Sequence, residues 1–293
     1  MFPNFTPQTL TANGVKIHTL TGGSGPPILL LHGYPQSHLI WHRIAPELAK
    51  TYTVVATDLR GYGASEKPPG LPDHANYSKR EMAKDQVEVM RQLGFDNFYL
   101  CGHDRGGRVA HRLAVDHPDV VKRLMVLDIS PTLAMYEQTT MEFARAYWWW
   151  FFLIQPTPFP ESMIAAAPET YLQKKIGWGH AGMSAFTPET YRAYLAHVSD
   201  PATMHAMCED YRAAASIDLD HDRADRAAGN KIVCPLNVLW GEFGVVHRCF
   251  KPLDDWRRVA RDVRGGTLPC GHYVPEEVPA ALLAEMLGFF ADR

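Results

Sequence analysis

An apolar strand, a turn rich in glycine and a helix follow one another without a spacer at residues 98–116, and this passage constrains the fold most strongly. The turn reads L-C-G-H-D-R-G-G from Leu100 to Gly107. Glycines beside Asp104 suit so sharp a turn, because a bulky neighbour would strain the backbone. Strands that pass directly into helices are typical of α/β proteins with a mostly parallel sheet.

Short apolar runs alternate with helical patterns through the first 130 residues. We predict strands at 27–31, 53–56, 98–101 and 124–127, and helices at 79–93 and 105–116. Continuous apolar strands separated by helices indicate a parallel sheet that helices cover on both faces. The fold class is therefore α/β.

The pattern changes after Pro131, where helical segments rich in proline and aromatic residues continue to about Ser216. We predict a helical cap at 132–216, inserted after the strand that ends near Asp128. A strand at 231–240, a last strand at 266–268 and a closing helix at 274–290 return to the sheet. The core domain would then consist of residues 1–131 and 217–293.

Charge and composition exclude several classes of partner. The 29 Lys and Arg against 32 Asp and Glu give a net charge of −3 without a basic run, which excludes a nucleic-acid or anionic-membrane footprint. The first residues, 1–6, do not have the charged and apolar regions typical of a signal peptide, and the longest apolar run, 146–154, is far shorter than the roughly 18 residues of a membrane span. The five cysteines are scattered, without C-x-x-C spacing. We expect a cytoplasmic protein with reduced thiols, no metal and no cofactor, whose partner is a small molecule; a homodimer is left open.

The turn around Asp104 has the G-x-Nu-x-G pattern of a nucleophile elbow, with Asp where many hydrolases have Ser; a plain surface turn is the alternative. An aspartate is already anionic at pH 7, so it can attack a saturated carbon and form an ester without a base. A base is then needed only to hydrolyse that ester.

His272, in C-G-H after the last predicted strand, is the candidate base, although a single histidine is often structural. The base needs an acid to orient it. We prefer Asp128, at the end of its strand, to the rival Glu242, which follows the strand ending at Trp240.

The motif H-G-Y-P at 32–35 follows the first predicted strand and forms a tight loop, with a cis bond before Pro35 as one option. Its backbone N–H at Tyr34, with the N–H of Arg105, would form an oxyanion hole for the ester-hydrolysis step.

Arg105 and Arg108 lie three residues apart in the first turn of the helix after the elbow. Cations are disfavoured at this end of a helix, so stability does not explain them. Asp104 can balance one charge, and the other points to an anionic ligand such as a carboxylate, which arginine binds in bidentate fashion. A solvated helix face is the alternative.

The aromatic run Y-W-W-W-F-F at 147–152 spans more than one helical turn, so at least one ring faces away from the core that the others enter. Most such runs are core, but Trp and Tyr donors facing a site would suit a departing halide. Tyr211 is a second donor of this kind.

Together these motifs resemble the haloacetate (fluoroacetate) dehalogenases of the α/β-hydrolase superfamily over essentially the whole chain. The matching segments are H-G-Y-P-Q at 32–36, D-L-R-G-Y-G-A-S at 58–65, D-H-A-N-Y-S at 73–78, G-H-D-R-G-G-R at 102–108, V-L-D-I at 126–129, A-R-A-Y-W-x-W at 144–150, C-E-D-Y-R-A at 208–213 and C-G-H at 270–272.

The resemblance implies hydrolysis of a haloacetate to glycolate and halide. It makes Asp104 the nucleophile, His272 the base and Asp128 its acid partner. It also makes Arg105 and Arg108 the clamp for the substrate carboxylate, and it assigns the halide to Trp150 and Tyr211. The family usually has His where this chain has Trp149. We expect Trp149 to line the halide site as well, and we expect this change to weaken the release of fluoride, which depends on strong donors.

Two other functions compete with this one. An epoxide hydrolase would share Asp104 and His272 and use two cap tyrosines, here Tyr147 and Tyr211, to protonate the epoxide oxygen. It would typically have Trp in the place of Arg105, because its substrate is neutral. A hydrolase-fold binding protein would be expected to lack one of the three catalytic residues, and this chain has all three.

Overall fold

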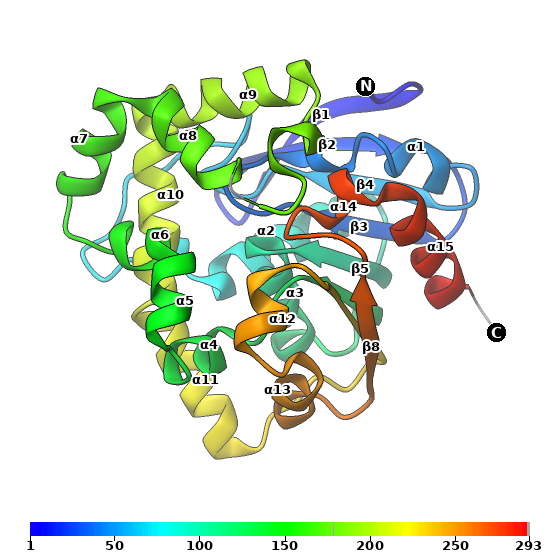
Figure 1. The fold of residues 1–293 in the computed structure, drawn as a ribbon. Coiled ribbons are helices and arrows are strands. Elements are labelled where there is room, and N and C mark those ends of the chain that lie inside the picture. The colour runs from blue at the N-terminus through cyan, green and yellow to red at the C-terminus, as the bar shows by residue number, and fades with distance from the viewer. Residues whose placement is uncertain (178, 292–293) are drawn as a thin grey trace.

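The apolar runs predicted as strands form the centre of one eight-stranded sheet in the order β1-β2-β4-β3-β5-β6-β7-β8 (Figure 1). The structure is a computed structural model and describes residues 1–177 and 179–291. β1 pairs antiparallel with β2, and β2 pairs antiparallel with β4. All the other neighbouring strands are parallel. The strands are β1 (Phe5–Ala12), β2 (Val15–Gly22), β3 (Pro27–Leu31), β4 (Thr53–Thr57), β5 (Phe98–His103), β6 (Val121–Leu127), β7 (Leu236–Gly241) and β8 (Val263–Leu268).

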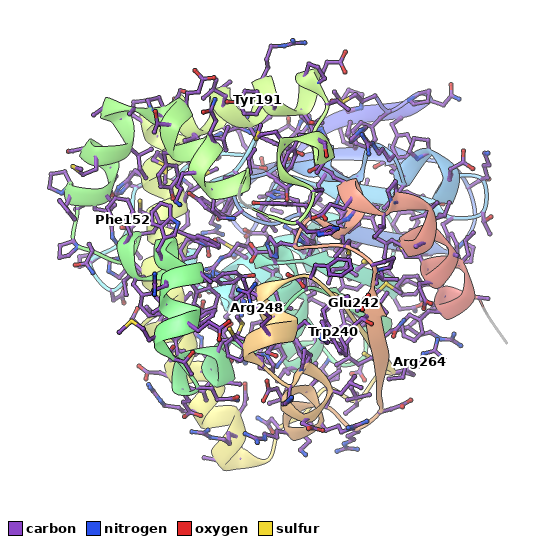
Figure 2. All side chains as sticks on the ribbon, in the orientation of Figure 1. Phe152, Tyr191, Trp240, Glu242, Arg248 and Arg264 are labelled. Carbon is purple, nitrogen blue, oxygen red and sulfur yellow. The ribbon has the colours of Figure 1, made fainter. Side chains whose placement is uncertain are left out.

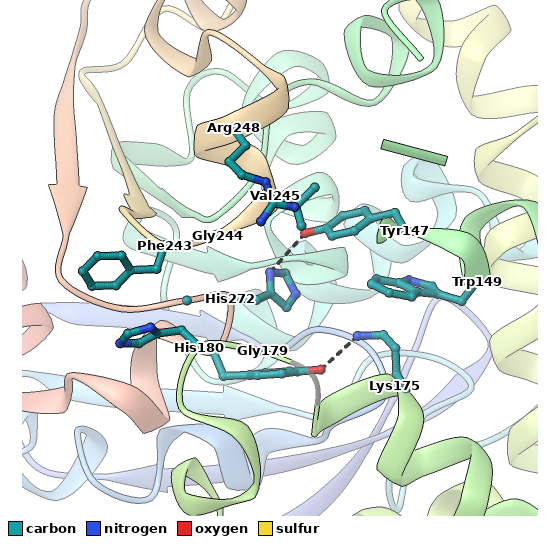
Figure 3. A pocket seen from close by; sticks show the side chains of 12 residues that line it. Tyr147, Trp149, Lys175, Gly179, His180, Phe243, Gly244, Val245, Arg248 and His272 are labelled. Atoms are coloured by element: carbon teal, nitrogen blue, oxygen red, sulfur yellow. Dashed lines mark hydrogen bonds between the residues drawn. The ribbon is translucent and has the colours of Figure 1, made fainter. Parts of the chain in front are cut away.

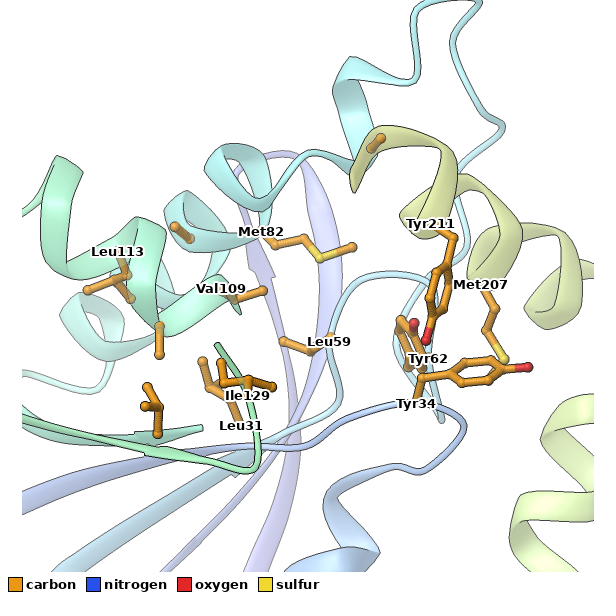
Figure 4. Close-up of a cluster of buried hydrophobic side chains, with 14 of the residues drawn as sticks. Leu31, Tyr34, Leu59, Tyr62, Met82, Val109, Leu113, Ile129, Met207 and Tyr211 are labelled. Carbon is orange, nitrogen blue, oxygen red and sulfur yellow. The ribbon is translucent and has the colours of Figure 1, made fainter. Parts of the chain in front are cut away.

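Helices cover both faces of the sheet because alternate strand residues enter two separate cores. Leu30 and Cys101 pack with Leu282 on the face of η1 (His38–Trp41), α1 (Ala45–Leu48) and α15 (Pro279–Phe290). The opposite face holds Leu31 and Val109, under the helices α2 (Lys79–Gln92), α3 (Arg105–Asp116), α12 (Val245–Cys249) and α13 (Pro252–Val259) (Figure 4). The two short elements that remain in this part of the chain are η2 (Ala75–Tyr77) and α14 (Val274–Glu277).

A run of helices separates β6 from β7 and lies over the carboxyl ends of the strands (Figure 1). Four of its helices, α7 to α10, have proline in the first turn, where the missing N–H costs no hydrogen bond. The run consists of α4 (Thr132–Glu137), α5 (Met141–Ala146), α6 (Trp148–Phe152), α7 (Phe159–Ala166), α8 (Pro168–Ile176), η3 (Gly182–Ala185), α9 (Pro188–Ser199), α10 (Pro201–Ala214) and α11 (Ile217–Ala228). The helical run therefore continues past Ser216. The predicted boundary between residues 216 and 217 would place α11 in the core domain, but α11 follows α10 directly and packs on α4.

The structure adds one hairpin to the predicted elements and changes two of them. The hairpin of β1 and β2 was not predicted, and the strand predicted at 231–240 is regular only from Leu236, after Pro235. The closing helix divides into α14 and α15, because Pro279 begins a new helix. No helix in the described part of the chain is long and apolar enough to cross a membrane.

Candidate active site

Asp104 occupies the turn between β5 and α3 and has a φ of 46°, which non-glycine residues rarely adopt. The turn is so tight that a Cβ on Gly102 would lie 2.5 Å from the carbonyl oxygen of Gly106, and a Cβ on Gly106 would lie 2.4 Å from that of His32. Only glycine fits at these two positions. The turn therefore has the geometry of a nucleophile elbow, with a strained carboxylate at its tip.

The carboxylate of Asp104 is buried but surrounded by groups that favour its charge. Its Oδ1 accepts a hydrogen bond of 3.0 Å from the backbone N–H of Tyr34, and its Oδ2 lies 3.9 Å from Nε2 of His272. Burial raises the pKa of Asp104, but His272 and Arg108 outweigh burial and hold the pKa well below its ordinary value. Asp104 is therefore an anion poised for attack.

His272 is held by Asp128, whose Oδ2 lies 2.5 Å from Nδ1 of the imidazole. The other carboxylate oxygen of Asp128 accepts a hydrogen bond of 3.0 Å from the N–H of Gly241. The rival acid, Glu242, is exposed on the surface after β7 (Figure 2). This arrangement directs Nε2 of His272 toward Asp104, as base catalysis requires.

The loop after β3 brings the N–H of Tyr34 to the nucleophile. The Tyr34–Pro35 bond is cis, the option considered from the sequence. The Tyr34 side chain extends away from this N–H, and its hydroxyl lies 2.6 Å from that of Tyr171 in α8. One of the two predicted oxyanion donors therefore contacts the carboxylate directly.

Arg105 has a partner that the sequence analysis missed. Its Nε and Nη2 donate to the two carboxylate oxygens of Asp210 at 2.9 and 2.6 Å, and Nη2 also donates to the Asp210 backbone oxygen. The sequence left open which arginine Asp104 balances, and in the structure Asp210 of α10 pairs with Arg105. Nη1 has no hydrogen bond to residues 1–177 or 179–291, so Arg105 retains at most this nitrogen for a ligand.

Arg108 differs from Arg105 in having no carboxylate within 4.0 Å among the described residues. Its Nη1 donates to Thr132 and to the backbone oxygen of Ser130, and its buried Nε has no partner there. The guanidinium carbon lies 4.6 Å from the centre of the Trp150 ring. Burial lowers the pKa of Arg108, against the opposing effect of Asp104. A buried cation of this kind needs an anion from outside the protein.

Two of the predicted halide donors are buried and unpaired within the described chain. The indole nitrogen Nε1 of Trp150 and the hydroxyl of Tyr211 have no hydrogen-bond partner there. The Tyr211 ring lies 4.2 Å from the Arg105 guanidinium and 5.2 Å from the Tyr34 ring, and it extends from α10 toward Tyr34 and Tyr62 (Figure 4). Orphaned donors are costly, so their presence favours a bound acceptor.

A cavity of about 240 Å³ opens beside His272 (Figure 3). Its wall includes Trp149, one of the predicted halide ligands, and Tyr147, whose hydroxyl lies 3.4 Å from Nδ1 of His272. Lys175 of α8 also lines the cavity, and the sequence analysis did not single it out. A cavity of this size fits a small molecule.

One group of potential metal ligands lies elsewhere, at His18, His38 and Asp58. Both oxygens of Asp58 are already in use, because Oδ1 accepts from the N–H of His38 and lies 2.8 Å from its Nδ1, and Oδ2 accepts from Ala64. These contacts tie the D-L-R-G loop to η1, which accounts for the group without a metal.

Comparison with known proteins identifies the family of this fold. Residues 26–244 match the family described as alpha/beta hydrolase fold. An alpha/beta hydrolase of known structure from Nostoc sp PCC 7120 is 53% identical, with a TM-score of 0.97 over 100% of both chains. The chain therefore belongs to the α/β-hydrolase fold family.

Two curated relatives narrow this class. A fluoroacetate dehalogenase from Burkholderia sp is 47% identical over 98% of this chain and 95% of its own. A soluble epoxide hydrolase from Corynebacterium sp. (strain C12) is 34% identical over 95% of both. Within the α/β-hydrolases, the chain is a member of the fluoroacetate dehalogenase family, as its motifs indicated.

Proposed function

We propose that the protein is a hydrolase acting on carbon–halide bonds, which converts haloacetates and water to glycolate and halide. The observation that carries this proposal is Arg108, a buried cation beside Asp104 with no carboxylate within 4.0 Å in the described chain. A haloacid brings both the carboxylate that Arg108 lacks and the halide acceptor that Trp150 and Tyr211 lack. The similarity to the Burkholderia fluoroacetate dehalogenase supports the same activity.

In the first step, an oxygen of Asp104 attacks the carbon that bears the halogen. The new carbon–oxygen bond forms as the carbon–halogen bond breaks, and the halide leaves with the bonding pair. Arg108 and the free nitrogen of Arg105 bind the carboxylate, while the N–H of Trp150 and the O–H of Tyr211 donate to the halide as its charge develops. The product is a carboxymethyl ester of Asp104.

In the second step, His272 removes a proton from water, which attacks the carbonyl carbon of the ester. Asp128 stabilises the imidazolium that results. The N–H of Tyr34, already 3.0 Å from Oδ1, stabilises the oxyanion, and the N–H of Arg105 is assigned as the second donor. Collapse of this intermediate breaks the bond between the carbonyl carbon and the ester oxygen. The departing alkoxide takes the proton from the imidazolium of His272 and leaves as glycolate, and the second proton of the water is released to solvent as Asp104 returns to its carboxylate form.

The epoxide hydrolase is the second candidate, supported by the Corynebacterium relative. It would need Tyr147 and Tyr211 as paired proton donors to one oxygen. The hydroxyl of Tyr147 instead lies near His272, and a neutral epoxide would leave Arg108 uncompensated. These contacts favour the haloacid. Halide release from fluoro-, chloro- and bromoacetate, measured beside opening of a styrene-oxide-type epoxide, distinguishes the two substrates.

The covalent step has its own test. His272→Ala keeps the nucleophile and removes the base, so chloroacetate should leave the protein heavier by one carboxymethyl group in an intact mass measurement. In isotopically labelled water, a single turnover of the wild type should label the Asp104 carboxylate. Absence of label there would contradict the ester mechanism.

A further inference from the structure

Lys175 is a buried lysine in the wall of the active-site cavity. Its side chain is 2% exposed and extends from α8 toward the ring of Trp149, whose centre lies 4.0 Å from Nζ (Figure 3). Nζ donates one hydrogen bond of 2.9 Å to the hydroxyl of Tyr273, and the Tyr34 ring lies 5.6 Å away. No carboxylate of the described chain lies within 4.0 Å of it.

The other buried cations show how unusual this is. Of the seven buried lysines and arginines, five have at least one carboxylate within 4.0 Å: Arg60, Lys79, Arg105, Arg112 and Arg212. The two without one among the described residues are Arg108 and Lys175, and both face the active site. Burial lowers the pKa of Lys175 to about 7, and the charge of Asp104 opposes this effect. The fold therefore carries this charge at a cost.

The positive charge of Lys175 balances a second anion during the proposed reaction. Arg105 is balanced by Asp210, and the attack on the substrate does not change the charge of the Asp128–His272 pair, so these four groups are left out of the count. The remaining groups of the free site are the anion Asp104 and the cations Arg108 and Lys175. A haloacetate adds one negative charge, so two anions then face two cations. After attack, Asp104 is a neutral ester, but a halide and a carboxylate are present together, so two anions again face two cations. Without Lys175 this set would hold one more anion than cation in both states.

We propose that Lys175 supplies the second positive charge of the active site and binds a small monovalent anion there, a halide or a carboxylate. This inference rests on the proposed function, because only a haloacid reaction holds both anions at once. The ammonium has two protons beyond the one donated to Tyr273, so it can bind an anion without breaking that contact. The aromatic rings around it hold the charge in place without neutralising it.

Anion binding can be measured without turnover. Bromide quenches tryptophan fluorescence, and Trp149 and Trp150 lie at the site, so a saturable part of the quenching reports bromide there. Glycolate binding is followed by calorimetry. Loss of one charge-assisted contact in Lys175→Met should weaken bromide, glycolate or both by about ten- to hundred-fold. Lys175→Arg, which keeps the charge, should recover most of the affinity.

Lys174→Met is the matched control, because Lys174 is the preceding residue of α8 and is exposed. It should bind both anions as the wild type does. Replacement of an uncompensated buried charge by an apolar side chain is not expected to unfold the protein. If Lys175→Met nonetheless melts early, Lys175→Gln, which is neutral but can still hydrogen-bond Tyr273, takes its place.

The anion whose affinity falls identifies the group that Lys175 holds. Unchanged affinity for both anions in the neutral variants would overturn the inference, as would a wild type that binds neither. These outcomes are separate from failure of the proposed function: a protein that binds bromide through Lys175 but releases no halide from haloacetates would refute only the activity. Halide release by a wild type whose anion binding ignores Lys175 would refute only the inference.

Discussion

Substitution of Arg105 or of Arg108, both in the first turn of α3, by leucine should separate folding from substrate binding. Arg105 is fully buried and makes three hydrogen bonds to Asp210. Its removal leaves part of a buried carboxylate unpaired, which costs about 3–5 kcal/mol of unfolding free energy. Lys79 and Tyr62 still contact Asp210, so we expect the lower end, about 3 kcal/mol.

Arg108→Leu should behave in the opposite way. The variant loses the hydrogen bonds that the Arg108 guanidinium donates to Ser130 and Thr132, but it also removes a buried charge with no carboxylate within 4.0 Å among the described residues. The two effects oppose each other, so stability should change by about 1 kcal/mol or less. The contact with the substrate carboxylate is charge-assisted and worth about 1.5–3 kcal/mol. Its loss should lower kcat/KM for chloroacetate at least about tenfold.

Urea denaturation and chloride release, measured on the same preparations, test both halves of this prediction. Chloroacetamide is the matched neutral substrate, which the wild type should process far less well than chloroacetate. The reasoning is refuted if Arg108→Leu turns over chloroacetate normally. It is also refuted if Arg108→Leu destabilises the protein as much as Arg105→Leu does.

Two further predictions concern the halogen and pH. Trp149→His should raise the ratio of kcat/KM for fluoroacetate over chloroacetate, because fluoride needs stronger hydrogen-bond donors than chloride does. The control Trp148→His changes a residue about 100° around the helix and should leave the ratio unchanged. An equal ratio in both variants would contradict the role of position 149. Burial raises the pKa of Glu276 from 4.5 to about 8, so the folded protein retains a proton that the unfolded chain loses between these values. Through this group, the free energy of unfolding should fall by about 1 kcal/mol or more from about pH 5 to about pH 8. Urea denaturation at several pH values should show a smaller fall for Glu276→Gln than for the wild type. The same dependence on pH in both proteins would contradict the prediction.

Much of the central sheet is predictable because buried parallel strands are continuous apolar runs. The predicted bounds of β3 and α3 agree with the structure residue for residue. The β1–β2 hairpin was missed because its strands are polar and partly exposed at the sheet edge. A signal was available in Asn13-Gly14, the dipeptide of tight hairpin turns, and both residues have positive φ.

The candidate site is most readily predictable where a residue follows its own strand. Asp104, Asp128 and His272 each end a strand or its following turn, and the parallel topology brings these ends together. Asp210 and Lys175 reach the site from cap helices, and no local pattern says which buried group a helical side chain will meet. Their contacts with Arg105 and Trp149 depend on packing between segments far apart in the chain. The catalytic and binding roles, the domain boundaries, the cytoplasmic location and a homodimer stay predictions.

The contacts of Asp210 also determine how a ligand reaches the nucleophile. This aspartate belongs to α10 of the helical run, yet it binds Arg105 of α3 and Lys79 of α2, beneath the sheet's carboxyl edge. A swinging lid would pull these opposite charges apart inside the protein, at a cost of several kcal/mol. These contacts therefore oppose movement of α10 away from the sheet, and we expect ligands to enter through the cavity beside His272, where Phe243 stacks on His180 with ring centres 4.2 Å apart. Variants that accept bulkier substrates should therefore carry smaller side chains around this cavity, at Phe243 or His180, rather than changes that make α10 more mobile.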